Sequence, residues 1–194
     1  MANYLFNNCL SGTTCLLQKY KINEFKSVGI SLVTTYTGNV NGNDILYLGG
    51  YLYTVILSAN TISKFDLNLN LITSVNTESG TTYMCDDGTY IYACTNTTTY
   101  KFDTDLNFQT SATTINWKYG LYVSGYLYVL NGYTIYKYDA ITLTLVDSVA
   151  YGTASYTAMA LTTDNTYLYV GGKLNTGYGG LLNKYDFPTI LLMQ

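Results

Sequence analysis

Short runs of alternating apolar and polar residues cover the whole chain. Aromatic and β-branched residues alternate with polar ones over four to eight positions, and Gly, Asn and Asp bound the runs. A period of two residues is typical of half-buried β-strands, whereas an amphipathic helix repeats its apolar positions every 3.6 residues. No stretch of useful length has the helical period. The pattern therefore predicts an all-β fold.

Two sequence elements recur along the chain. The first is a Tyr-Leu-Tyr type strand, and its five copies begin at Tyr4, Tyr51, Tyr90, Tyr126 and Tyr167. The second centres on a lysine next to an aromatic residue, with copies at Lys19, Lys64, Lys101, Lys137 and Lys184. A spacing of roughly 40 residues indicates a repeat architecture. It predicts one domain over 1–194, with repeats at about 1–38, 39–78, 79–115, 116–152 and 153–194.

Each complete repeat contains four predicted strands. In the fourth repeat these strands are Tyr119–Val123, Tyr126–Leu130, Tyr133–Tyr138 and Leu143–Val149, with turn residues between them. We label the four strands of a repeat A to D in chain order. A four-stranded antiparallel sheet at this period is typical of one blade of a β-propeller.

The motif Gly125-Tyr126-Leu127-Tyr128-Val129, followed by Ile135-Tyr136-Lys137-Tyr138-Asp139, resembles the propeller repeats of the YVTN and quinoprotein-like kind. The resemblance covers nearly the whole chain and implies a propeller blade, without specifying an activity. With five repeats it predicts a five-bladed β-propeller of four-stranded antiparallel blades. No Trp-Asp pair ends a blade, which disfavours the WD40 group.

The first blade is expected to be atypical, because the first repeat begins at strand B. Its innermost strand is absent, or the C-terminal run Ile190–Met193 supplies it, or a neighbouring subunit completes the blade. We favour a ring closed by contact between the first and last repeats, since terminal repeats are often atypical.

Composition and charge exclude several classes of protein. The 194 residues contain no Arg and no His, and the net charge is −3. Imidazole chemistry is therefore absent, and the phosphate backbone of nucleic acids has little to bind. No apolar run is long enough for a transmembrane helix, and no secretory leader is evident, so we expect no membrane insertion. No nucleophile lies beside a base, so we expect neither enzyme activity nor a cofactor.

The long segments between repeats and between strands B and C are predicted to share one rim. They carry aromatic residues among Gly, Asn, Thr and Ser, which are Tyr36, Trp117, Tyr151, Tyr156 and Tyr178. Such residues give contact area at low entropic cost, so they are the candidate binding or assembly surface. The alternative is that they cover the ends of the core.

The remaining candidates are cysteines, acidic residues and lysines. Cys9 and Cys15 flank a five-residue turn and could form a disulfide, or they are buried free thiols. The segment Asp103–Asn107 begins like a calcium loop but lacks the required Gly and Glu, so no metal site is predicted. The repeated lysines on strand C are expected to form weak ion pairs with the Asp two residues on, or to lie at a solvated edge.

The function hypothesis rests on composition. The chain has few charged residues, many Tyr, Thr and Asn, and Lys without Arg. This composition resembles that of virion structural proteins of archaeal spindle-shaped viruses. It implies a non-enzymatic structural or assembly protein of a virion, such as a tail, nozzle or spike-base component, or of an extracellular particle. Its partners would be other structural proteins or copies of itself. The alternative is a lectin-like or receptor-binding propeller that binds a host-surface glycan.

Overall fold

The computed structural model describes residues 3–11, 14–22, 30–38, 44–56, 60–77, 83–151, 156–176, 179–186 and 191–192. Within these ranges the regular secondary structure is entirely β, as the alternating pattern predicts. No helix in this part of the chain is long and apolar enough to span a membrane.

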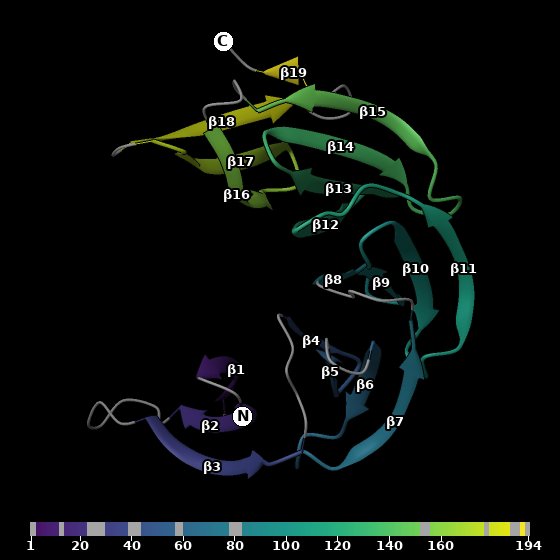
Figure 1. Cartoon of the computed structure of the whole chain (residues 1–194), viewed down its shortest axis with the longest axis vertical. Coiled ribbons are helices and arrows are strands. Elements are labelled where there is room, and N and C mark those ends of the chain that lie inside the picture. The colour runs from purple at the N-terminus through teal and green to yellow at the C-terminus, as the bar shows by residue number, and fades with distance from the viewer. Residues whose placement is uncertain are drawn as a thin grey trace. The chain divides into compact units, whose positions relative to one another are not determined.

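The strands form antiparallel sheets, and each sheet uses strands that are consecutive in the chain (Figure 1). The first sheet has three strands, β1 (Asn3–Ser11), β2 (Thr14–Ile22) and β3 (Ile30–Tyr36). The second contains β4 (Ile45–Leu48), β5 (Tyr51–Ile56), β6 (Thr61–Phe65) and β7 (Leu71–Asn76). The third contains β8 (Tyr83–Asp86), β9 (Tyr90–Cys94), β10 (Thr98–Asp103) and β11 (Phe108–Thr113).

Two further four-stranded sheets follow. The fourth sheet contains β12 (Tyr119–Val123), β13 (Tyr126–Asn131), β14 (Thr134–Asp139) and β15 (Leu145–Ala150). The fifth contains β16 (Tyr156–Thr163), β17 (Tyr167–Leu174), β18 (Gly180–Asp186) and β19 (Leu191–Leu192). The strands predicted for the fourth repeat agree with β12 to β15 to within two residues at each end.

The prediction of four-stranded antiparallel sheets is confirmed for four of the repeats. In the described residues the first sheet has three strands, so the count of five complete blades stays a prediction. The suggestion that the C-terminal run completes the first sheet is wrong, because Leu191 and Leu192 pair with Asp186 and Tyr185 of β18.

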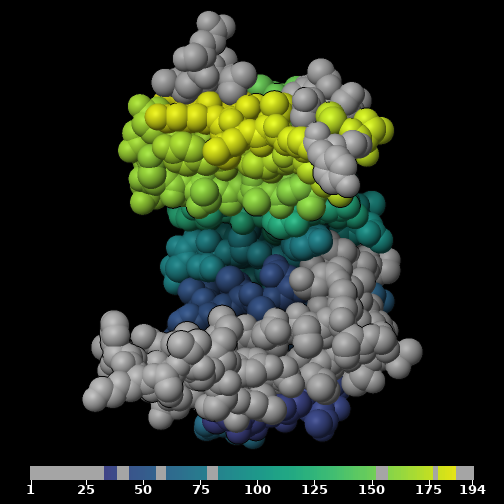
Figure 2. All heavy atoms as spheres, turned by 90° about the vertical axis from the view of Figure 1, so that its left-hand side faces the viewer, coloured from purple at the N-terminus to yellow at the C-terminus, as the bar shows by residue number. Residues whose placement is uncertain are grey.

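The chain divides into two compact units. The first comprises residues 1–82 together with the turn 104–107, and the second comprises the rest. In the second unit β12 lies against both β8 and β16, so the first strands of its three sheets are neighbours. Buried side chains lie between successive sheets of this unit, including Tyr92 with Leu127, and Tyr128 with Leu168. Figure 2 shows the closely packed atoms of β16 to β18 on one face of this unit.

Candidate functional site

The turn between strands C and D has the same organisation in several repeats, and it begins with an aspartate. The Asp139 Oδ1 atom accepts hydrogen bonds from the backbone N–H groups of Thr142 and Ile141, at 2.7 and 2.9 Å. These bonds to Thr142 and Ile141 hold the pKa of the Asp139 carboxyl below its usual value. Asp66 likewise accepts from the N–H groups of Asn68 and Asn70. The carboxylate therefore fixes the backbone of each turn.

A buried leucine follows in each of these turns. Leu69, Leu106 and Leu143 have φ angles of 66°, 64° and 57°, and at most 5% of each side chain is exposed. A positive φ is unfavourable for a residue with a side chain. Leu69 packs with Phe65, and Leu143 packs in the core that contains Leu127. Burial of the side chain therefore offsets the backbone strain and anchors the turn.

The repeated lysines lie over tyrosine rings of the neighbouring strand. The distances from Nζ to the ring centroid are 4.0 Å for Lys64 over Tyr51, 4.2 Å for Lys101 over Tyr90, 4.1 Å for Lys137 over Tyr126, and 3.4 Å for Lys184 over Tyr167. These are cation–π contacts, which strengthen as the cation loses water. Lys64, Lys101 and Lys137 are at most 8% exposed. The expectation of a solvated edge is therefore wrong for these three residues.

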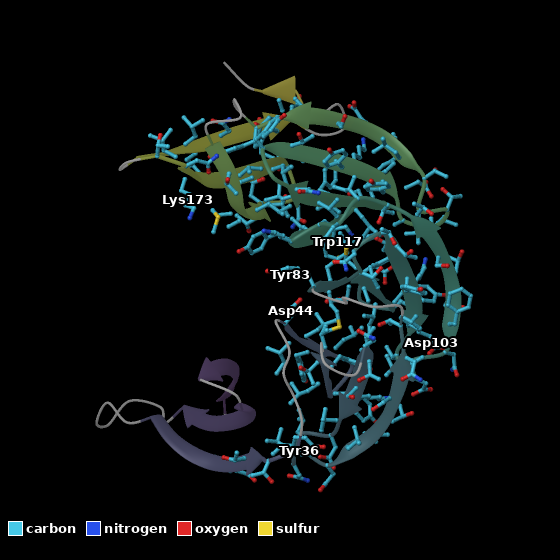
Figure 3. The ribbon with its side chains drawn as sticks, viewed as in Figure 1. Tyr36, Asp44, Tyr83, Asp103, Trp117 and Lys173 are labelled. Atoms are coloured by element: carbon cyan, nitrogen blue, oxygen red, sulfur yellow. The ribbon has the colours of Figure 1, made fainter. Side chains whose placement is uncertain are left out.

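In the first unit, Lys64 and a tyrosine hold the turn of the following repeat. The Lys64 Nζ atom lies 2.7 Å from Asp105 Oδ1, and the Tyr53 hydroxyl donates to the carbonyl oxygen of Thr104 at 2.6 Å. The carboxylate partner of Lys64 is thus in the next C–D turn, whereas the sequence predicted the Asp two residues on. Both acceptors belong to the Asp103–Asn107 segment, which begins at the Asp103 labelled in Figure 3.

The second unit repeats this arrangement. The Lys101 Nζ atom donates to the carbonyl oxygen of Ala140 at 3.0 Å. The Tyr92 hydroxyl donates to Asp87 Oδ2 at 2.7 Å and also lies 3.2 Å from the Ala140 oxygen. Ala140 follows Asp139 as Thr104 follows Asp103, so the two acceptors occupy the same position of the repeat. One Tyr and one Lys therefore hold the next C–D turn at both places.

Exposed apolar side chains come directly after these anchored turns. The first residues of the outer strands, Leu71, Phe108 and Leu145, are 49%, 58% and 55% exposed. Each of these three strands then has a register shift, which leaves one extra residue: Ile72 in β7, Gln109 in β11 and Val146 in β15. We call Leu71, Ile72, Phe108, Ile141, Leu145 and Val146 the outer-corner residues.

Two of the five aromatic residues predicted to form the rim are buried. Trp117 and Tyr151 are 1% and 0% exposed, so neither ring is available to a partner, and their proposed role in binding is corrected. The Trp117 Nε1 atom donates to Thr99 Oγ1 at 2.9 Å, and its ring packs with Cys94 and Leu127 (Figure 3). Trp117 and Tyr151 instead belong to the core, in agreement with the alternative that the aromatic residues cover its ends.

The other predicted residues have mixed outcomes. Tyr36 is half-buried and lies edge-to-face on Phe65, with ring centroids 4.9 Å apart. Tyr156 begins β16, its side chain is outside the described part, and Tyr178 lies outside the described residues altogether. In the pairing of β1 with β2, Cys9 is opposite Leu16 and Cys15 is opposite Leu10. The side chains of both cysteines fall outside the described part, so their disulfide stays a prediction.

The described residues contain no group of three or more His, Cys, Asp or Glu side chains that could hold a metal ion. Cys85 and Cys94 are buried free thiols, and burial raises the pKa of Cys94 to about 12. Burial also raises the pKa of Tyr128 to about 12. These shifts arise from desolvation in the core, which disfavours the charged forms.

Comparison with solved structures agrees with this architecture. Similar structures include Saccharomyces cerevisiae Sqt1, with a TM-score of 0.74 at 12% identity, and a Rom2 CNH domain, with 0.71 at 9%. The WD40 domain of Neurospora crassa Pan2 has a TM-score of 0.68 at 13% identity. The fold is of the β-propeller type.

The propeller likeness concerns the fold alone. The matches cover 94%, 96% and 92% of this chain but 56%, 64% and 58% of the Sqt1, Rom2 and Pan2 chains. This chain therefore spans about three fifths of the propellers that it matches. No protein-family profile matches it, and no curated protein does. The absence of a Trp-Asp blade ending is compatible with a WD40-like fold, because at this identity the fold persists without the sequence signature.

The outer-corner residues were missed at the sequence level, although a signal for them was present. Leu71-Ile72 and Leu145-Val146 are adjacent apolar pairs, and they break the alternation expected of a strand with one buried face. Such a pair after an Asp-containing turn indicates a bulge with outward apolar side chains.

Proposed function

We propose that this chain is a non-enzymatic β-propeller interaction module, which binds protein partners through its outer-corner residues. The observation that carries the proposal is the repetition of exposed apolar side chains directly after turns that are anchored by a buried leucine. Single exposed apolar residues are ordinary on protein surfaces. Here they recur at one repeat position in β7, β11 and β15.

Rigid presentation favours binding. A side chain on a fixed backbone loses little conformational freedom when a partner covers it, so more of the contact energy remains as affinity. The Asp139 hydrogen bonds and the Lys101–Ala140 contact fix the turn that precedes Leu145 and Val146. The apolar side chains of Leu145, Val146 and Ile141 are 51% to 76% exposed and supply the contact area.

The proposal also covers the number of blades and the setting in which the protein works. We take each sheet as one blade, which gives five blades with a three-stranded first blade. The virion or extracellular-particle setting stays a proposal that rests on composition, and a protein-binding surface that is poor in charge is compatible with it. The glycan-binding alternative depended in part on Trp117 and Tyr151, which are buried.

The test compares two variants as immobilised baits in extracts of cells that produce the protein. One variant combines Phe108→Ser, Leu145→Ser and Val146→Ser, which removes outer-corner residues of the second unit. The control is Leu182→Ser, because Leu182 is 78% exposed on β18 and lies outside the outer corners.

We expect a defined protein that the wild-type chain and the Leu182→Ser control retain stoichiometrically, and that the triple variant loses. Equal retention by the triple variant would show that the outer corners are not the binding surface. Circular dichroism should be the same for all three baits, since the replaced side chains are exposed.

A further inference from the structure

The outer strand of each sheet has backbone groups that point away from its neighbour. In the third sheet the N–H of Thr114 donates to the carbonyl of Thr97, at 3.0 Å. Hydrogen-bonded pairs alternate in an antiparallel ladder, so the pairs 99–112 and 101–110 are bonded as well. The N–H and C=O of Ser111 therefore point outward, and the same argument from the Thr77–Asn60 bond applies to Ser74 in β7.

In β15 the corresponding N–H group is hydrogen-bonded to a side chain of the same strand. The Tyr151–Tyr133 hydrogen bond places the N–H of Ser148 on the outward side. Asp147 Oδ1 accepts a hydrogen bond from this N–H at 2.7 Å. A carboxylate at an edge blocks strand pairing in two ways, because it satisfies the free amide and repels other acidic groups. The edge of β15 is thus capped.

The edges of β7 and β11 lack this cap. Thr73 and Thr110 stand where β15 has Asp147, since they pair with Lys64 and Lys101 as Asp147 pairs with Lys137. Within the described part of the chain, the N–H groups of Ser74 and Ser111 have no such side-chain acceptor. Neither strand contains Lys, Pro or an acidic residue, the usual devices that protect an edge. The strands β7 and β11 have the same β-bulge as β15, so the bulge does not distinguish the three edges.

We infer that the outer edge of β11 pairs with the same edge of a second copy of this chain, as an antiparallel strand pair. The inference deepens the proposed function by naming a partner, and it rests on that function. An outward row of N–H and C=O groups is complementary to another backbone. Because β11 (Phe-Gln-Thr-Ser-Ala-Thr) is uncharged, two copies of it bring no like charges together.

Two observations favour β11 over the other outer strands. Self-pairing of β15 would bring two Asp147 carboxylates to the same interface, which opposes that pairing. Phe108 is 58% exposed beside the open edge of β11, and it is the one aromatic among the outer-corner residues. Covering this ring adds apolar burial to the backbone hydrogen bonds.

The first experiment measures native mass by light scattering over a range of concentrations, with the 194-residue chain. Thr110→Asp copies the cap of β15, and the cross-strand lysine already present at this position makes the change compatible with the fold. We expect wild type to form a dimer, and Thr110→Asp to weaken it at least tenfold. Thr110→Ser is the matched control and should dimerise as wild type does. A monomer at every concentration would overturn the inference.

The second experiment separates backbone pairing from contacts of side chains alone. Hydrogen exchange of the Ser111 amide should slow as the dimer forms, while the inward Ala112 amide should not change. Two results would overturn the assignment to β11. One is a dimer in which exchange of the Ser111 amide is unchanged. The other is a dimer that Thr73→Asp in β7 disrupts and Thr110→Asp does not. If the triple outer-corner variant abolishes the dimer but Thr110→Asp does not, the inference fails and the proposed function stands.

Discussion

The ammonium group of Lys101 lies 3.0 Å from the carbonyl oxygen of Ala140, 39 residues further along the chain. The Tyr92 hydroxyl lies 3.2 Å from the same oxygen, and Lys101 also lies over the Tyr90 ring. One buried cation therefore joins two strands of its own sheet to the turn of the next repeat. This arrangement makes specific predictions for stability.

Replacing Lys101 with Met should destabilise the fold by about 2 kcal/mol. The change removes a charge-assisted hydrogen bond and a cation–π contact, each of which contributes on the order of 1 to 2 kcal/mol. Urea unfolding, followed by circular dichroism, measures the difference in the free energy of unfolding. Lys173→Met is the control, since Lys173 is exposed, and it should change stability by less than about 0.5 kcal/mol. Equal effects of the two variants would contradict the structural role of Lys101.

Replacing Leu143 with Ala should cost about 2 to 4 kcal/mol, because the side chain is 1% exposed. Leu143 has a φ of 57°, a conformation that glycine adopts without strain. Leu143→Gly should therefore be at least as stable as Leu143→Ala, the reverse of the usual order of these residues. Thermal unfolding of both variants measures the order. A less stable glycine variant would show that backbone strain at this turn is unimportant.

Replacing Gly120 with Ala should disturb the single tryptophan. An added Cβ atom would lie 2.8 Å from Trp117 Cζ3 and 3.0 Å from Cys85 Sγ, so the ring must shift. We expect a lower unfolding temperature and a changed Trp117 emission spectrum. Gly171→Ala is the matched control, because nothing lies within 4 Å of the added atom. An unaltered spectrum for Gly120→Ala would contradict the packing of Trp117.

Acid should destabilise the fold partly through Asp139. Hydrogen bonds to its carboxylate lower its pKa in the folded chain, so its stabilising contribution is complete above about pH 4. That contribution is lost as the pH falls through the lowered folded-state pKa. Asp139→Asn keeps an acceptor oxygen without the charge and should flatten the loss of thermal stability below about pH 4.

Asp86 provides the opposite control for the same pH series. Burial raises its pKa in the folded chain, so protonation of Asp86 favours the folded state as the pH falls. Asp86→Asn should therefore leave a steeper loss of stability in acid than wild type has. If wild type and Asp139→Asn lose thermal stability equally as the pH falls, the stabilising role of the Asp139 carboxylate is contradicted.

The buried thiols should resist modification in the folded chain. Burial raises the pKa of Cys94 to about 12, and Cys85 is buried as well. A variant with Cys9→Ser and Cys15→Ser leaves these two thiols for measurement. At pH 8 a disulfide reagent should label neither in the native state and both after denaturation. Rapid labelling of one thiol in the native state would contradict its burial.

Local pattern predicts the strands, because alternation and turn residues act within a few positions. Tyr119–Val123 was predicted to the residue, and Gly49, Gly88 and Gly125 have the positive φ angles that tight turns require. The four-stranded sheets follow from these local signals together with the repeat period.

Burial of the candidate site could not be predicted in the same way. Trp117 lies in a segment of polar composition, and its burial depends on contacts with Cys94 and Thr99, about 20 residues earlier. Lys101 lies between two aromatic residues in the sequence, but its partner Ala140 belongs to the next repeat. Such contacts arise between repeats, so the sequence of one repeat does not encode their geometry.

The Tyr-and-Lys contact with the next C–D turn has a consequence for how such a chain can change in length. Each such contact takes its donors from one repeat and its acceptor from the C–D turn of the next, as the contacts of Lys64 with the Asp105 carboxylate and of Lys101 with the Ala140 carbonyl illustrate. Duplication of one whole repeat brings a new donor set together with a new acceptor turn. Growth or loss by whole repeats therefore leaves the buried cations partnered, while an insertion within a repeat separates donor from acceptor.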